Sequence, residues 1–209
     1  ALYAAVHPRL RKAFDLLAAT DFSKLEAGRH LLDGEDIRMY APGSLRRLVG
    51  IVLQDTVLFS DTVRYNLAYA KPGATMEEVK RAAELAHADD FIAHLPQQYE
   101  TVLQSAGAEL SAGQRQLLAI ARACLASPRI LILDEATEGL APVIRAEIWA
   151  CLSLLKTEGQ SILIVDKNLR ELKRLADHHI IIEKGQTVWQ GSSADMDRDA
   201  DRVRRYVGL

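Results

Sequence analysis

Residues 110–139, LSAGQRQLLAIARACLASPRILILDEATEG, constrain the fold of this chain more than any other stretch. In its second half, an apolar run at residues 130–133 follows Ser127-Pro128 and ends in Asp134-Glu135. Short apolar runs between such breaks are typical of strands buried on both faces of a parallel sheet. Because parallel sheets bind ligands at their carboxyl ends, this pattern predicts that Asp134 and Glu135 lie at a ligand-binding edge.

The two carboxylates have a possible chemistry and an ordinary alternative. A carboxylate at a strand end can hold a magnesium ion, and a second one beside it can orient an attacking water. Taken alone, however, Asp134-Glu135 favours a simple strand end whose acids cap the following turn.

The first half of the stretch predicts a helix with a polar, small-residue start. Leu117, Leu118, Ile120, Ala121 and Leu125 recur at helical spacing, and Ser111 stands where an N-cap residue is expected. Free backbone amides in the first turn of such a helix can receive a phosphate. The alternative is an ordinary capped helix.

Taken together, the LSxGQ string, the following QRQ and the four apolar residues before Asp-Glu resemble two motifs of one family. They are similar to the signature motif and the Walker B motif of ATP-binding cassette (ABC) ATPases. The resemblance implies an α/β fold of the P-loop NTPase type, with a mostly parallel sheet. We expect a single nucleotide-binding domain over residues 1–209, with a helical subdomain at about 55–125 and without the family's N-terminal strands.

Two branches of the family are represented in different parts of the chain. Residues 27–70 resemble the exporter branch, and Gln54 matches the glutamine of its Q-loop. After Glu135, the string EGLAP at residues 138–142 is similar to the ATPases that import branched-chain amino acids.

The phosphate-binding loop, GxxGxGK[ST] in the family, is degenerate here. Counting back from Gly28 places Val6, Arg9, Arg11, Lys12 and Ala13 on its defined positions, so that only the lysine is retained. The missing glycines normally allow backbone amides to surround phosphate, and the missing hydroxyl normally ligates magnesium. Nucleotide binding within the same chain is therefore an open question at this stage.

The resemblance implies ATP and Mg²⁺ as ligands, with a defined role for each matching residue. Asp134 and Gln54 would hold magnesium, and Glu135 would polarise the attacking water. Lys167 takes the position of a histidine that contacts the γ-phosphate in relatives, although an exposed lysine opening a helix is an equally good interpretation.

The remaining implied contacts are to the nucleotide itself. Lys12 would contact the phosphates of ATP in its own chain. The residues of the signature motif would bind the ATP held by an opposite chain: Ser111, Ala112, Gly113 and Gln114.

Several further elements are predicted from periodicity and turn signals. We expect a helix over 75–88 opened by a capping box of Thr75 and Glu78, a helix over 143–156 and a buried strand over 161–165. A two-stranded unit should cover 180–191, and the charged tail after Ser192 is typical of a solvated helix.

Composition narrows the function classes further. A formal net charge of −2 gives no sign of a nucleic-acid partner, and no apolar run reaches the roughly 20 residues that a membrane span needs. Cys124 and Cys151 fit buried free thiols. By resemblance, the partners would be a second nucleotide-binding domain, identical or different, and a transmembrane subunit, which places the chain in the cytoplasm at the inner face of a membrane.

Two functions follow from which motifs are retained. The first is an ATP-binding domain that couples ATP binding and hydrolysis to solute transport. The alternative is a catalytically impaired protein of the same fold that completes a partner's ATP site through LSAGQ. A third reading is a truncated or recombined chain without activity.

Overall fold

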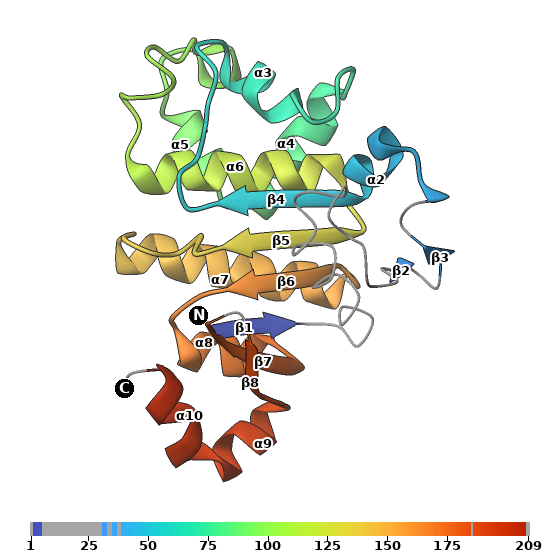
Figure 1. Ribbon diagram of the computed structural model, residues 1–209. Helices are drawn as coiled ribbons and strands as arrows, with labels where there is room; N and C mark the ends of the chain where they lie inside the picture. The colour runs from blue at the N-terminus through green and yellow to red at the C-terminus, as the bar shows by residue number, and fades with distance from the viewer. Residues whose placement is uncertain (1, 6–30, 33–34, 37–38, 185, 208–209) are drawn as a thin grey trace.

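The computed structural model describes residues 2–5, 31–32, 35–36, 39–184 and 186–207. Its main element is a six-stranded sheet with the order β4-β5-β6-β1-β7-β8 (Figure 1). In chain order, the strands are β1 (Leu2–Ala5), β4 (Val49–Leu53), β5 (Ile130–Asp134), β6 (Ser161–Val165), β7 (His178–Glu183) and β8 (Gln186–Gly191).

The three strands β4, β5 and β6 are parallel neighbours. Leu53 pairs with Asp134, and Asp134 pairs with Val165, so the three carboxyl ends lie along one edge. In β5, the first four residues are buried and Asp134 is exposed, which confirms a strand covered on both faces that ends in an accessible acid. The fold is thus of the α/β class that the sequence predicts, with a parallel group of β4, β5 and β6 inside a mixed sheet whose other pairings are antiparallel.

β1 runs against its neighbours. It pairs antiparallel with both β6 and β7, and its residues Tyr3 and Ala5 lie opposite Val165 and Leu163, respectively. Since β6 ends at Val165, β1 points away from the edge where Asp134 lies. β1 therefore does not deliver its carboxyl end to that edge.

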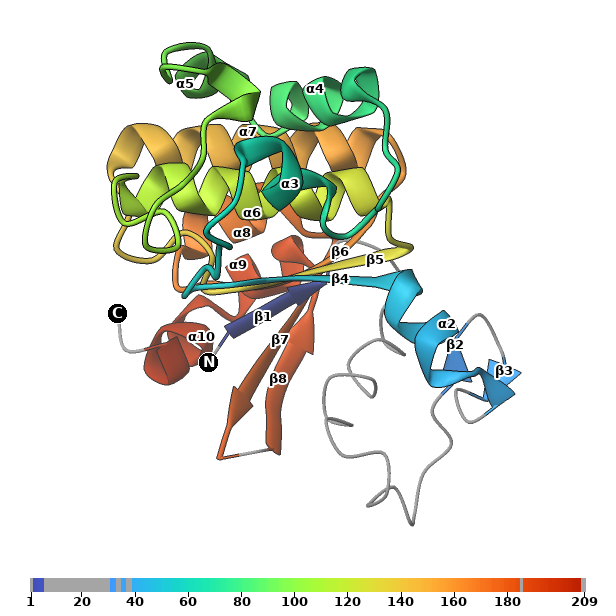
Figure 2. The ribbon, with the colours of Figure 1, turned by 90° about the horizontal axis from the view of Figure 1, so that it is seen from above.

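Three helices cover one side of the sheet: α6 (Ala112–Ala126), α7 (Pro142–Thr157) and α8 (Leu169–Leu175), as Figure 2 shows. Their apolar faces and the strands form one core, in which Leu118, Leu131, Ile148 and Ile162 are fully buried. Removal of these side chains from water is the main stabilising contribution to this arrangement.

α6 ends abruptly and feeds β5. Its C-cap residue, Ser127, has a φ of 47°, the left-handed conformation that commonly closes a helix. Pro128 follows and cannot continue the helix, so the chain turns directly into the strand that ends at Asp134.

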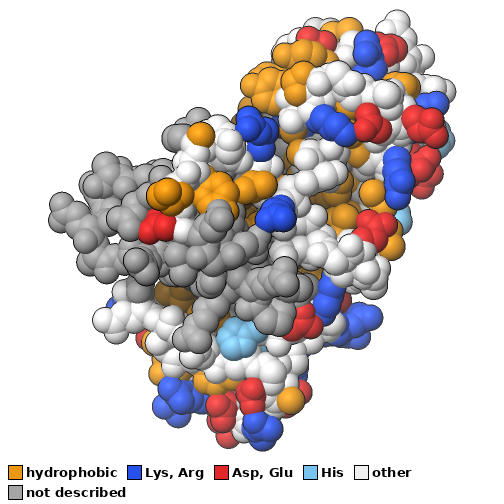
Figure 3. All heavy atoms as spheres, turned by 90° about the vertical axis from the view of Figure 1, so that its right-hand side faces the viewer, with side chains coloured by type: hydrophobic (Ala, Val, Ile, Leu, Met, Phe, Trp, Pro, Cys, Tyr) orange, Lys and Arg blue, Asp and Glu red, His pale blue; other side chains and the backbone are white. Residues whose placement is uncertain are grey.

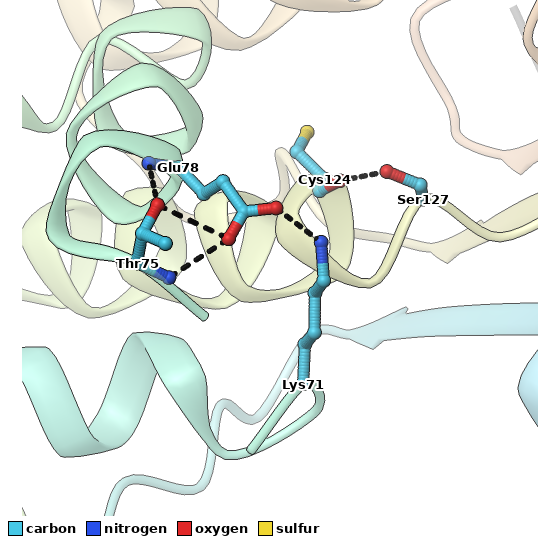
Figure 4. Close-up of polar contacts among 5 residues, drawn as sticks. All are labelled: Lys71, Thr75, Glu78, Cys124 and Ser127. Atoms are coloured by element: carbon cyan, nitrogen blue, oxygen red, sulfur yellow. Dashed lines mark hydrogen bonds and ion pairs between the residues drawn. The ribbon is translucent and has the colours of Figure 1, made fainter. Parts of the chain in front are cut away.

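A group of short helices lies beyond β4: α3 (Val63–Ala68), α4 (Met76–Leu85), α5 (Asp89–Ala93) and the 3₁₀ helix η4 (Gln98–Glu100). In Figure 4, Thr75 and Glu78 form the expected capping box, and Lys71 Nζ lies 2.6 Å from Glu78 Oε1. α4 ends three residues before the predicted limit of Ala88, because His87 adopts a φ of 54°.

Smaller elements complete the described chain. The pair β2 (Leu31–Leu32) and β3 (Glu35–Asp36) and the helix α2 (Pro42–Leu48) precede β4. Among the side chains coloured by type in Figure 3, basic and acidic ones are interspersed.

The tail after β8 is more integrated than the sequence predicts. It forms α9 (Ser193–Arg198) and α10 (Ala200–Val207), in which Met196 and Val203 are buried. The indole nitrogen of Trp189 donates to Asp199 at 2.8 Å. The tail is helical and most of its charged residues are exposed, as expected of a solvated helix, but Met196 and Val203 also dock it against the core.

Candidate functional site

Asp134 and Gln54 lie at the ends of neighbouring parallel strands. Leu53 is the register partner of Asp134, and Gln54 is the next residue along the chain. Both side chains are exposed, and within residues 39–184 neither makes a hydrogen bond or ion pair. Their free oxygens fit the ligand preference of magnesium.

These two side chains could supply only part of the coordination shell of a magnesium ion, with the other ligands coming from outside the protein. The described residues contain no group of three or more His, Cys, Asp or Glu suited to hold a metal. Magnesium is commonly held by one or two protein oxygens together with phosphate oxygens and water, which is the arrangement that Asp134 and Gln54 could support.

Glu135 is held in an unusual backbone conformation directly after β5. Its φ is 50°, a region that non-glycine residues enter at a cost. Its N–H donates to the carbonyl of Val165 at 2.8 Å, which ties the end of β5 to the end of β6. The side chain is half-buried at the same edge as Asp134.

Lys167 lies close to the carboxylate of Glu135 but forms its main ion pair with Glu138. Its Nζ is 2.7 and 2.9 Å from the two carboxylate oxygens of Glu138, and 3.8 Å from Oε1 of Glu135. The hydrogen bond with Lys167 lowers the pKa of Glu138, and the hydrogen bond with the Glu138 carboxyl raises the pKa of Glu135. The pair with Glu138 raises the pKa of Lys167, which therefore remains a cation at neutral pH.

A buried hydrogen bond holds the same two loops together below the surface. The hydroxyl of Thr137 donates to Oδ2 of Asp166 at 2.5 Å, and the N–H of Asn168 donates to Oδ1 at 2.8 Å. Asp166 is only 6% exposed. Sequence reasoning missed both Asp166 and Glu138, because their partners are some 29 positions away and no local pattern marks them.

The signature residues form a local structure at the start of α6. Ser111 is the N-cap, its Oγ accepts the N–H of Gln114 at 3.2 Å, and Oε1 of Gln114 accepts the N–H of Ser111 at 2.9 Å. Ser111 and Ala112 are exposed, so this helix start is accessible to an outside group. The expected N-cap is confirmed.

Gly113 is buried and packs against α7. A Cβ added to it would lie 2.9 and 3.0 Å from two carbon atoms of Ile144. Such contacts are shorter than packed side chains tolerate, so a larger residue would force Ile144 to move, and packing favours glycine here whatever its role toward phosphate.

α6 also anchors the loop that contains Gln54. The buried Gln116 accepts a short hydrogen bond from Thr56 and donates to the carbonyl of Leu53 at 3.1 Å, so it grips the chain on both sides of Gln54. Arg122 donates to the carbonyls of Asn66 and Val57. The sequence contains these residues in the QRQ string and the helix, but their role is visible only in three dimensions.

Lys12 lies outside the described residues, as does the whole predicted phosphate loop at residues 6–13. Of the predicted site residues that the structure does describe, Gln54, Asp134, Glu135 and Lys167 lie at one edge of the sheet. Among the described residues, no hydrogen bond or ion pair joins these four side chains to Ser111, Ala112, Gly113 or Gln114.

Parallel strands with acids at their carboxyl ends, together with a capped helix that has a small-residue start, fit the class of nucleotide-binding α/β folds. A comparison with protein families narrows the class: the model of the ABC transporter family matches residues 16–138. The chain belongs to the ABC transporter family.

Individual relatives agree with this assignment. The chain is 43% identical over 171 residues to an ATP-dependent lipid A-core flippase of Syntrophus aciditrophicus, covering 82% of this chain and 28% of the flippase. It is 41% identical over 182 residues to the toxin RTX-I translocation ATP-binding protein of Actinobacillus pleuropneumoniae, covering 87% and 26%, respectively. The chain thus spans about a quarter of the length of these relatives.

A solved structure supports the same fold. A bacterial Atm1-family ABC exporter with ATP bound superimposes with a TM-score of 0.77 and 38% sequence identity, over 86% of this chain and 32% of that one. Within the part of the chain that the structure describes, no helix has the length and apolar character needed to cross a membrane.

Proposed function

We propose that this chain is the nucleotide-binding domain of an ABC transporter and couples ATP binding and hydrolysis to the movement of a solute. The observation that carries the proposal is the alignment of Gln54, Asp134 and Glu135 along one strand edge, with all three side chains accessible. The names of the relatives, a lipid flippase and a toxin translocation protein, support transport as the process served.

Each residue has a role that its geometry permits. Asp134 and Gln54 would hold magnesium, which would supply neutralisation of charge on the phosphates of ATP. Glu135 orients the attacking water and accepts its proton, as a carboxylate at this position can. Lys167 contributes a point charge toward the terminal phosphate, which requires that it share or leave its pair with Glu138.

The nucleotide contacts involve two chains. Lys12 contacts the phosphates in its own chain, whereas the exposed start of α6 receives the ATP of an opposite chain. At that helix start, Ser111 and Ala112 are accessible and Gln114 is half-buried, which supports a contact made across an interface rather than within the chain. The partner in this arrangement is a second nucleotide-binding domain, identical or different.

A transmembrane subunit is the second proposed partner. Two exposed aromatic side chains, Tyr65 and Tyr69, line a pocket of about 510 Å³ beside α3. Phe59 packs against both tyrosines, with ring centroids 6.1 and 4.4 Å away. An apolar and aromatic surface of this kind is suited to docking a protein segment, which would hold the chain at the cytoplasmic face of a membrane.

The relatives, an ATP-dependent flippase and a translocation ATP-binding protein, do not favour the trans-acting alternative, but one observation makes it worth testing. Lys167 stands in place of the family histidine and is bound to Glu138, so the supply of catalytic groups differs from that of a competent site. In that alternative, Glu135 has no role and only the signature acts, on the ATP of a different partner.

The test compares steady-state ATP hydrolysis by four proteins: the wild type, Glu135→Gln, Ser111→Ala and Thr75→Ala. Loss of a general base reduces rates by roughly 10²- to 10⁴-fold, so Glu135→Gln should abolish most activity. Ser111 and Thr75 both cap helices through capping boxes, and each alanine variant should lose about 1 kcal/mol of stability. Of these two alanine variants, only Ser111→Ala should also lose ATP hydrolysis.

The outcomes separate the two functions. Retained hydrolysis in Glu135→Gln would contradict the proposed role of this residue. If the chain is inactive alone but Ser111→Ala, and not Glu135→Gln, weakens hydrolysis by an added partner domain, the trans-acting alternative takes its place.

A further inference from the structure

Gln116 is a polar side chain of α6 that lies inside the protein. It is 2% exposed, and burying an amide costs free energy unless its hydrogen-bonding groups are satisfied. Its Nε2 donates to the carbonyl of Leu53 at 3.1 Å, and its Oε1 accepts a hydrogen bond from the hydroxyl of Thr56. Both ends of the amide are therefore bonded to the segment that follows β4.

Arg122, on the same helix, holds the next residue of that segment. Its Nη1 donates to the carbonyl of Val57 at 3.0 Å. α6 is thus bonded to the chain before and after Gln54 and Asp55, and these two residues are exposed. The bend after β4 therefore presents two side chains to solvent while α6 fixes the backbone on both sides of them.

The sheet alone does not determine where Gln54 lies. Among the described strands, β4 has a neighbour on one side only, which is β5 (Figure 1), and the register of this pair ends with Leu53 opposite Asp134. Gln54 is the residue after this last pair, so the strand pairing places its backbone at one end only. The hydrogen bonds of Gln116 supply the second constraint.

Gln54 is one of the two proposed magnesium ligands, and such ligands need neighbours that orient them. Loss of an orienting neighbour typically reduces metal affinity by roughly 10- to 100-fold. We propose that Gln116 is a positioning residue, which holds Gln54 beside Asp134 and thereby strengthens the magnesium-dependent binding of ATP. This inference rests on the proposed function, in which Gln54 and Asp134 would hold magnesium.

The structure offers a second glutamine as a matched control. Gln160 is half-buried and, like Gln116, donates from Nε2 to backbone carbonyls, those of Arg129 at 3.2 Å and Ser161 at 3.1 Å. These two residues lie at the amino ends of β5 and β6, at the edge opposite Asp134. Gln116→Met and Gln160→Met therefore remove the same kind of hydrogen bond at the two ends of the sheet.

Calorimetric titration of the full chain with ATP, in excess magnesium and in EDTA, separates positioning from general damage. Gln116→Met should weaken binding in magnesium by roughly tenfold or more and leave binding in EDTA unchanged, because only the metal contact depends on Gln54. Gln160→Met should bind like the wild type in both conditions. A cooperative melt above the assay temperature shows that each variant is folded.

Thr56 provides a milder pair of variants at a half-buried site, in case the core substitution unfolds the chain. Thr56→Val removes the hydroxyl that donates to Gln116, whereas Thr56→Ser keeps it. Thr56→Val should therefore show a smaller loss of ATP affinity that is again specific to magnesium. Thr56→Ser should bind ATP as the wild type does.

The order of Gln54 in the free chain gives a readout that needs neither metal nor nucleotide. In ¹⁵N relaxation measurements on the wild type, the amides of Gln54 and Asp55 should have order parameters near those of rigid backbone, about 0.85. In Gln116→Met these values should fall below about 0.6, which is typical of flexible backbone. Gln160→Met should leave both amides as ordered as in the wild type.

The positioning role is rejected if Gln116→Met binds ATP in magnesium as the wild type does, or if it loses affinity equally in magnesium and in EDTA. It is also rejected if Gln54 stays ordered in that variant, or if Thr56→Ser binds as weakly as Thr56→Val. A wild-type chain whose ATP binding does not depend on magnesium would instead reject the proposed magnesium ligands, and the role of Gln116 with them.

Discussion

The start of α6 and the loops after β5 and β6 both carry proposed site residues, yet they are held in place by different means. Ser111 and Gln114 bond to each other within one helical turn. Glu138 and Lys167 meet across 29 positions of sequence, and Thr137 and Asp166 do the same. The first arrangement is local and survives in any chain that forms the helix, whereas the second exists only when β5 and β6 are paired.

This difference indicates which part of the site keeps its structure when the sequence changes elsewhere in the site. A capped helix start depends on a few neighbouring residues and remains intact whatever residues 6–13 do. The loop pair depends on the full sheet register, so its geometry responds to changes anywhere along β5 and β6. The following experiments test this contrast, beginning with the largest expected effect.

The two regions can be compared only at a pH at which the sheet that holds the loops is fully stable. The ionisable group that sets this pH is His179 in β7. Burial, together with repulsion from His178 and Lys173, lowers the pKa of His179 from 6.5 to about 4. The unfolded chain therefore binds this proton first as pH falls. Stability should be complete above pH 6.5 and decrease by about 3 kcal/mol, at roughly 1.36 kcal/mol per unit, as pH falls toward 4.

Denaturant melts of the wild type and His179→Asn between pH 4 and 8 check this expectation. The variant should lose most of the slope between pH 6.5 and 4. An unchanged slope would assign the acid sensitivity to other groups.

Thr137→Val tests the long-range link between the loops. It removes a donor to the buried Asp166 carboxylate and should cost about 2 kcal/mol. Thr157→Val is the matched control, since Thr157 bonds only to the carbonyl of Leu154 at an exposed helix end. If the two variants melt alike, the link contributes nothing to the loop arrangement.

Gly113→Ala tests whether the signature region is as independent as its capping box implies. The added methyl group would press on Ile144 and should destabilise the fold by roughly 1–2 kcal/mol after the gain in helix propensity. Ile144→Ala should relieve that cost in the double variant. Additive effects in this double-mutant cycle would show that the glycine and Ile144 do not interact.

Lys167→Gln is expected to have the smallest effect on stability. Its side chain is 72% exposed, and exposed ion pairs contribute little. The melting temperature should stay near the wild-type value while hydrolysis decreases, because the positive charge near Glu135 is lost. A large loss of stability would mean that this pair, rather than the buried Thr137–Asp166 bond, holds the loops.

The sequence predicts well what is encoded within a few residues. The caps at Ser111 and Thr75 and the strand Ser161–Val165 are confirmed because turn chemistry and apolar runs act locally. It does not predict the antiparallel placement of β1, since strand direction depends on which neighbours are available in space. The role of Gln116 is not predicted either, because an amide in a helical pattern does not reveal its hydrogen bonds with the Leu53 carbonyl and the Thr56 hydroxyl.

The candidate site likewise contains residues whose positions could be predicted from the sequence and contacts that could not. Asp134, Glu135 and Gln54 could be placed at one edge because parallel strands align their carboxyl ends. The engagement of Lys167 by Glu138 could not, because side chains of two separate loops choose their partners only after the sheet forms.

Calorimetric titration of the purified chain with ATP, with and without magnesium, tests the central claim most directly. The account predicts binding that strengthens with magnesium, weakens in Lys12→Ala and persists in Glu135→Gln, in which only the water-orienting group is changed. A chain that melts cooperatively yet binds no ATP at millimolar concentration, with or without magnesium, would contradict the proposal that it is a working nucleotide-binding domain.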